Sequence, residues 1–104
     1  MTTHSRENRN CLHLVVRSSI DALESCRSRF DAGDAVLFLD DGVMHITGNP
    51  GRIFQPLFRK GYFSDPDLDA RGLRTLAGDA GVRIISDPEF VGLLQKYDFC
   101  LTWK

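Results

Sequence analysis

Cys26 lies in the stretch LESC, inside a segment whose pattern predicts an amphipathic helix. A cysteine thiolate can attack a persulfide or a disulfide, whereas a thiol on a packed helix face acts as a small apolar residue. With Ser18 as the N-cap, Cys26 would lie two turns into the helix. The helix dipole lowers a thiol pKa mainly within the first turn, so Cys26 would gain little from it. Arg29 could stabilise a thiolate there, and Glu24 would oppose it. The residues alone leave two hypotheses open, a buried structural cysteine and a reactive thiol.

Asp40, Asp41 and Gly42 follow the strongest predicted strand, at its carboxyl end. Open parallel sheets bind ligands at that edge, and paired carboxylates there could hold Mg²⁺ or exchange protons. The same three residues are also ordinary chemistry for a turn from a strand to a helix. The turn is the favoured interpretation.

Other sites are poorly supported by the sequence. It contains no G-x-G-x-x-G, no Walker A loop and no C-x-x-C, and the glycine-rich TGNPG lacks a lysine. The histidines His4, His13 and His45 show no metal-ligand spacing with the cysteines Cys11, Cys26 and Cys100. We therefore expect no metal and no cofactor. His13 is predicted to be a satisfied core group, and Arg71 to pair with Asp67 on a helix surface.

Composition restricts the class of protein. The chain has 104 residues with 13 basic and 14 acidic side chains, so it lacks the basic excess of a protein that binds nucleic acid directly. It has no run of roughly 20 apolar residues and no apolar segment typical of a signal peptide. These features predict a cytoplasmic protein without membrane contact. We expect a disordered tail over 1–10 and a single domain over 11–104.

Strand and helix patterns alternate along that domain. Strands are predicted at 11–16, 35–40, 61–64, 82–86 and 99–103. Helices are predicted after Ser18 with Gly33 as C-cap, at Asp65–Pro66, and after Asp87 as N-cap. The pattern indicates an α/β fold: an open, mostly parallel five-stranded sheet with helices on both faces. The segment containing Phe54 and Phe58 is predicted to be a short helix or a flap.

Several of these stretches, taken in order, resemble the DsrH/TusB family of sulfur-relay subunits. They are LHLVVRS, ALESC, GDAVLFLDDGV, PDLDARGL and EFVGLL…TW, with Leu12–His13, Asp41-Gly42 and Ala70-Arg71-Gly72 among them. The resemblance runs from about Cys11 to Trp103. It implies a DsrE-like, flavodoxin-like three-layer sandwich in a cytoplasmic complex that transfers persulfide sulfur.

The resemblance also implies partners and a site. Such chains assemble with DsrE- and DsrF-like (TusD- and TusC-like) subunits, and this one could form a homo-oligomer in isolation. The sulfur would serve either sulfur oxidation or 2-thiolation of tRNA wobble uridine. Cys26 matches the cysteine of DsrH-type members, which makes it the expected catalytic residue of a possible sulfurtransferase subunit. The rival hypothesis is a non-catalytic interaction subunit that carries no sulfur.

Overall fold

The computed structural model describes residues 10–48 and 61–104, which form one five-stranded sheet. All strands run parallel, in the spatial order β4-β3-β2-β1-β5. The strands are β1 (Cys11–Val15), β2 (Ala35–Phe38), β3 (Gly61–Ser64), β4 (Arg83–Ile85) and β5 (Phe99–Trp103). The five predicted strands are confirmed, with ends that differ from prediction by at most two residues.

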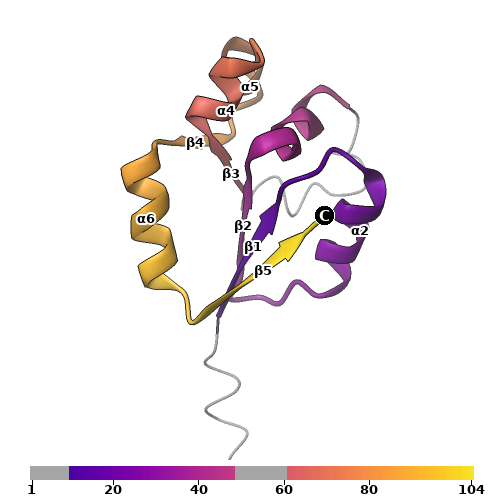
Figure 1. Ribbon diagram of the computed structural model, residues 1–104, viewed down its shortest axis with the longest axis vertical. Helices are drawn as coiled ribbons and strands as arrows, with labels where there is room; N and C mark the ends of the chain where they lie inside the picture. Colours follow the sequence, from indigo (N-terminus) through magenta and orange to yellow (C-terminus); the bar gives the residue numbers. More distant parts are fainter. Residues whose placement is uncertain (1–9, 49–60) are drawn as a thin grey trace, which may run out of the picture.

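Helices cover both faces of the sheet, as predicted (Figure 1). They are α2 (Ile20–Ser28), the 3₁₀ helix η1 (Asp40–Thr47), α4 (Asp65–Ala70), α5 (Arg74–Ala80) and α6 (Asp87–Lys96). The first three connections step across the sheet in one direction, so right-handed crossovers place α2, η1, α4 and α5 on one face. The last connection returns past the whole sheet to β5, which places α6 on the other face.

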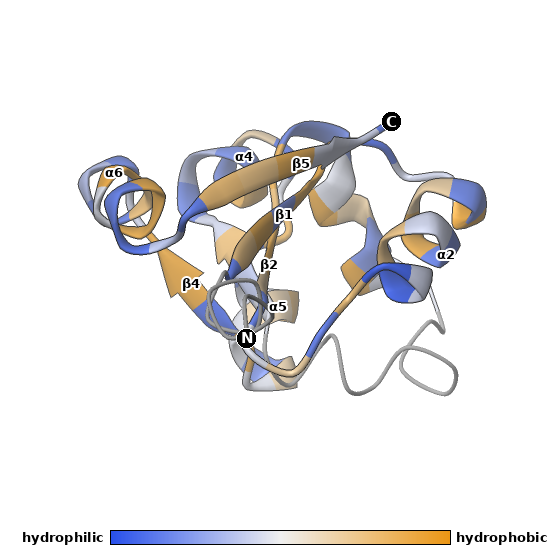
Figure 2. Ribbon diagram, turned by 90° about the horizontal axis from the view of Figure 1, so that it is seen from below, coloured by the Kyte–Doolittle hydropathy of each residue, from blue (hydrophilic) through white to orange (hydrophobic). Residues whose placement is uncertain are grey.

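Hydrophobic residues divide into one core on each side of the sheet. The larger core joins Phe38 and Phe63, whose rings stack at 4.6 Å between centroids, to buried residues of α2, η1, α4 and α5. The smaller core packs Leu93 of α6 against Leu12 and Leu37 of the sheet. Figure 2 shows the apolar strands lying between α2 and α6. The chain is therefore a three-layer α/β sandwich.

Helix α2 begins one residue later than predicted. Its N-cap is Ser19, whose hydroxyl accepts a hydrogen bond from the Ala22 N–H, so the assignment of Ser18 was wrong. Ile20 is consequently the first helical residue, and its side chain is 57 % exposed. The helix ends at Ser28 with Arg29 as C-cap, so Gly33 belongs to the loop before β2.

Two other helix starts are decided by polar side chains and proline. Ser86, rather than Asp87, caps α6, and a capping box joins it to Glu89, because each side chain bonds the other's backbone N–H. Pro66 lies in the first turn of α4 as predicted. The sequence did not predict α5 or the 3₁₀ helix η1.

The first described residue is hydrogen-bonded to the residue that precedes β5. Asn10, placed in the expected tail, donates its backbone N–H to Asp98 Oδ2 at 2.8 Å, and its carbonyl accepts from the Asp98 N–H at 3.0 Å. The rest of the predicted tail, and Phe54 and Phe58, lie outside the described residues. Within the described residues, no helix is long and apolar enough to cross a membrane.

Candidate functional site

Cys26 lies on the face of α2 that packs against the sheet. Its exposed fraction is 0 %, and it belongs to the larger core beside Val15 and Leu23. Burial raises the pKa of the thiol to about 12, and the nearby Cys11 and Asp34 add to the shift. A thiol with that pKa is protonated at neutral pH and is a poor nucleophile. In this fold Cys26 fills space in the core.

Of the three cysteines, only Cys100 is exposed. It lies on β5, the edge strand next to β1. Cys11 is buried at the start of β1, and burial, aided by the Asp34 charge, raises the pKa of its thiol to about 11. The fold therefore makes one thiol accessible and protects two.

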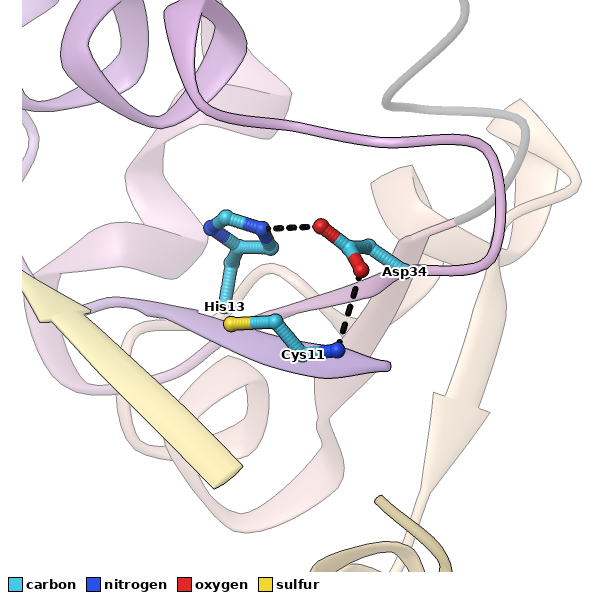
Figure 3. Close-up of side chains that lie close together, drawn as sticks. All are labelled: Cys11, His13 and Asp34. Atoms are coloured by element: carbon cyan, nitrogen blue, oxygen red, sulfur yellow. Dashed lines mark hydrogen bonds and ion pairs between the residues drawn. The ribbon is translucent and has the colours of Figure 1, made fainter. Parts of the chain in front are cut away.

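A polar cluster on the α2 side of the sheet was not predicted. It contains Cys11 and His13 of β1, Asp34 from the loop before β2, and Trp103 of β5 (Figure 3 shows the first three). The backbone N–H of Cys11 donates to Asp34 Oδ1 at 2.9 Å, and the Asp31 N–H donates to Oδ2 at 3.0 Å. The cluster links β1 to the loop that precedes β2 and to the last strand.

Hydrogen bonds determine the tautomer of His13. The indole N–H of Trp103 lies 2.9 Å from His13 Nδ1, and an indole can only donate. Nδ1 therefore accepts, and the proton of the neutral ring is on Nε2. Nε2–H donates to Asp34 Oδ2 at 2.8 Å. His13 has an exposed fraction of 0 % with both ring nitrogens paired, which confirms the prediction of a satisfied core histidine.

Cys11, His13 and Asp34 are also the described residues that come closest to a metal site. One ligand atom from each lies within 4.8 Å of the others. The tautomer argues against metal binding in this arrangement, because Nε2 holds the proton and Nδ1 is occupied by Trp103. Binding would also need a deprotonated Cys11, whose pKa is raised to about 11. The cluster is therefore a structural network as it stands.

At the carboxyl edge of the sheet, Asp41 forms an ion pair with the Arg71 guanidinium. Arg71 Nη2 donates to Asp41 Oδ1 at 2.9 Å, and Nη1 donates to the Asp67 carbonyl at 3.2 Å. The Asp67 carboxylate accepts the Asp40 N–H at 2.9 Å and lies 3.8 Å from Arg71. The predicted Arg71–Asp67 pair is confirmed. The Asp41 carboxylate and the Asp40 N–H are thus bound within the turn, which agrees with the interpretation favoured from sequence.

The turn after β2 needs glycine at position 42. Asp40 adopts φ 51°, an uncommon left-handed conformation for a residue other than glycine. Two residues later, a Cβ on Gly42 would overlap the carbonyl oxygen of Val15. The Asp-Asp-Gly sequence therefore brings the chain directly over the end of β1.

A small pocket lies on the other face of this edge. It is lined by Leu37, Leu39, Ser64, Asp67, Ile85, Ser86, Asp87 and Phe90. Its volume is about 80 Å³, well below the roughly 300–1,000 Å³ of ordinary ligand sites. It is too small for a nucleotide or an organic cofactor.

The fold and its two cores define a small three-layer α/β sandwich. A family model, DsrH like protein, matches residues 17–99, and the chain belongs to this family of sulfur-relay subunits. The match includes Cys26 and Asp34 and does not reach Cys11, His13 or Trp103. Members of the family work in complexes with other sulfur-relay subunits. No curated protein matches the chain.

Proposed function

We propose that this chain is a non-carrying subunit of a cytoplasmic persulfide-relay complex, which it forms with DsrE- and DsrF-like chains. Family membership supports the relay role. The observation that carries the rest is the complete burial of Cys26, together with a thiol pKa raised to about 12. A carrier thiol must be accessible to a donor persulfide and must react as a thiolate. In this fold Cys26 is buried and its thiol is protonated, so it meets neither requirement.

Exposed apolar side chains support an assembly role. Val91 and Leu94 lie one helical turn apart on α6, and Phe99 begins the edge strand β5. Apolar groups left exposed on a small domain often mark surfaces that a partner covers. In this role the chain shapes the complex, while a partner's cysteine carries the sulfur.

Sulfur carriage by Cys26 is the second candidate, favoured by its match to the DsrH-type cysteine. It requires α2 to separate from the sheet, because Cys26, Leu23 and Val15 lie in one core. Separation would expose this core, so carriage through Cys26 should depend on a partner that opens the domain. Either final acceptor, tRNA or a sulfur-oxidation protein, is compatible with both candidates.

The deciding experiment is intact-mass spectrometry after incubation with glutathione persulfide, alone and with the partner subunits. A Cys100→Ser background removes loading at the exposed thiol, and Cys26→Ser and Cys11→Ser are compared in that background. We expect assembly in each variant and no sulfur on Cys11 or Cys26; sulfur that the partners load stably onto Cys100 of the wild type would overturn the non-carrying role. One sulfur atom that is gained with partners and lost specifically with Cys26→Ser would replace the scaffold role by the carrier role.

A further inference from the structure

His13 connects the last strand to the interior of the sheet. It lies in the middle of β1, opposite Leu101 of β5, and its Nδ1 accepts the indole N–H of Trp103. Its other nitrogen is held by Asp34, which also accepts two backbone N–H groups. One imidazole therefore joins β5 to β1 and to the loop before β2. This connection requires a neutral ring, because Nδ1 must present a lone pair.

Protonation would act differently on the two bonds of this ring. An imidazolium has a proton on both nitrogens, so Nδ1–H would face the N–H of Trp103, donor against donor. The bond from Nε2–H to Asp34 would become charge-assisted and stronger. A proton on His13 therefore breaks the contact with Trp103 and retains the contact with Asp34.

We propose that His13 and Trp103 form a proton-sensitive latch: acidification releases the partly buried indole from His13, while His13 stays paired with Asp34. Imidazole side chains commonly change charge between about pH 5 and 8, within reach of physiological change. The inference concerns conformation and is independent of the proposed scaffold role.

The groups around His13 are compatible with this behaviour. The loop before β2 contributes the Asp34 carboxylate, and the apolar ring of Phe30 lies 5.2 Å away between centroids. The Cys11 thiol on β1 and the Cys26 thiol on α2 stay neutral, with pKa values raised to about 11 and 12. The Arg29 charge after α2 acts on Cys11.

Release of the indole would change the margin of the sheet. β5 is an edge strand that already exposes Phe99 and Cys100. The Val16 N–H still donates to the Trp103 carbonyl at 3.2 Å, so the backbone can remain in place while the side chain leaves. The latch thereby makes the position of the Trp103 side chain at the β5 edge of the sheet depend on pH.

The chain contains one tryptophan, so its indole N–H gives a single ¹⁵N–¹H cross-peak. We would follow this cross-peak and its solvent exchange from pH 8 to 5 in the wild type, His13→Gln and His45→Gln. In His13→Gln the amide can accept from Trp103 and donate to Asp34 without titrating, and His45→Gln removes the other histidine that is buried among the described residues. In the wild type and His45→Gln, the cross-peak should move, and its protection against exchange relative to the intrinsic rate at each pH should fall several-fold, with unchanged far-UV circular dichroism. In His13→Gln it should stay.

A cross-peak that stays in place until global unfolding, or that moves equally in His13→Gln, overturns the latch. A second measurement applies if His13→Gln does not fold. Trp103→Phe lacks the indole N–H, and urea unfolding followed by circular dichroism compares it with the wild type. The stability advantage of the wild type should shrink as the pH falls from 8 to 5. An advantage that is constant with pH also overturns the latch.

Discussion

Arg71, the C-cap of α4, donates a hydrogen bond to Asp41 of η1, with 2.9 Å between Nη2 and Oδ1. The two residues stand in separate short motifs, Asp41-Gly42 and Ala70-Arg71-Gly72, that resemble the DsrH/TusB pattern. In the fold the motifs meet: Arg71 fastens the turn after β2 to the helix after β3. This contact explains both motifs as one structural joint at the carboxyl edge of the sheet.

Arg71→Ala should lower the free energy of unfolding by about 1 kcal/mol, within the upper range for a partly exposed ion pair with an added hydrogen bond. Asp41→Asn should cost less, because the Asp67 carbonyl still accepts from Arg71. Urea unfolding of both single variants and the double variant measures the coupling. High salt should weaken it. Zero coupling in the double-mutant cycle would contradict the joint.

Gly42→Ala should be the more damaging of two matched glycine substitutions. The added Cβ would overlap the Val15 carbonyl oxygen, which can move only if the backbone moves. We therefore expect the free energy of unfolding to fall by about 1–3 kcal/mol or more. At Gly92 in α6 an added Cβ meets nothing within 4 Å. Gly92→Ala should therefore stabilise the chain by about 0.5–1 kcal/mol. Thermal unfolding should separate the two variants in opposite directions, and equal shifts would contradict this interpretation.

The sequence predicted the strands well because local runs such as AVLF and FCLTW carry their own signal. Helix starts were harder to place, because Ser18 and Ser19 are equally good caps and only tertiary packing selects between them. Helix η1 was not placed because Asp-Asp-Gly indicates a turn from a strand to a helix but not the length or the 3₁₀ geometry of the helix.

The polar cluster around His13 could not be assembled from sequence. His13 lies 21 residues from Asp34 and 90 residues from Trp103, so only the strand order brings them together. The prediction that His13 is a satisfied core histidine was confirmed. What the sequence lacked was the identity of the partners, because the placement of β5 beside β1 is a long-range property of the sheet.

His45 should make stability depend on pH. It is buried, its Nε2–H donates to the Arg17 carbonyl at 2.8 Å, and burial lowers its pKa below the ordinary 6.5. The unfolded chain therefore binds a proton at a pH where the folded chain does not, and stability is lost as the pH falls through about 6.5. The slope from this group is at most about 1.4 kcal/mol per pH unit.

His45→Gln should remove this part of the slope, since a Gln amide can still donate to the Arg17 carbonyl without titrating. Urea unfolding at a series of pH values between 7.5 and 5 compares the variant with the wild type. If the two curves run parallel over the whole range, burial of His45 does not contribute to the pH dependence.

Thiol accessibility should follow burial rather than position in the family pattern. With iodoacetamide at pH 8, the folded chain should alkylate rapidly at Cys100 and slowly at Cys11 and Cys26, whose pKa values are raised to about 11 and 12. In urea all three should react at similar rates. Peptide mapping over time measures the rates, and Cys100→Ser is the control that should abolish the fast phase. Rapid alkylation of Cys26 in the folded chain would show that α2 opens readily.

Metal binding should be weak in the wild type and stronger when Trp103 is removed. Cys11, His13 and Asp34 offer a sulfur, a nitrogen and an oxygen within 4.8 Å, but the Trp103 N–H keeps the histidine proton on Nε2. In Trp103→Phe the proton can move to Nδ1, which leaves Nε2 free to bind a metal ion together with the other two groups.

Co²⁺ is a suitable probe, because a thiolate bound to it gives a near-ultraviolet charge-transfer band. We expect this band in Trp103→Phe, its loss in the double variant with Cys11→Ser, and no band in the wild type. A wild-type band that depends on Cys11 would mean that a metal ion can displace Trp103. The hydrogen bond from Trp103 to His13 would then not prevent metal binding, which would contradict this prediction.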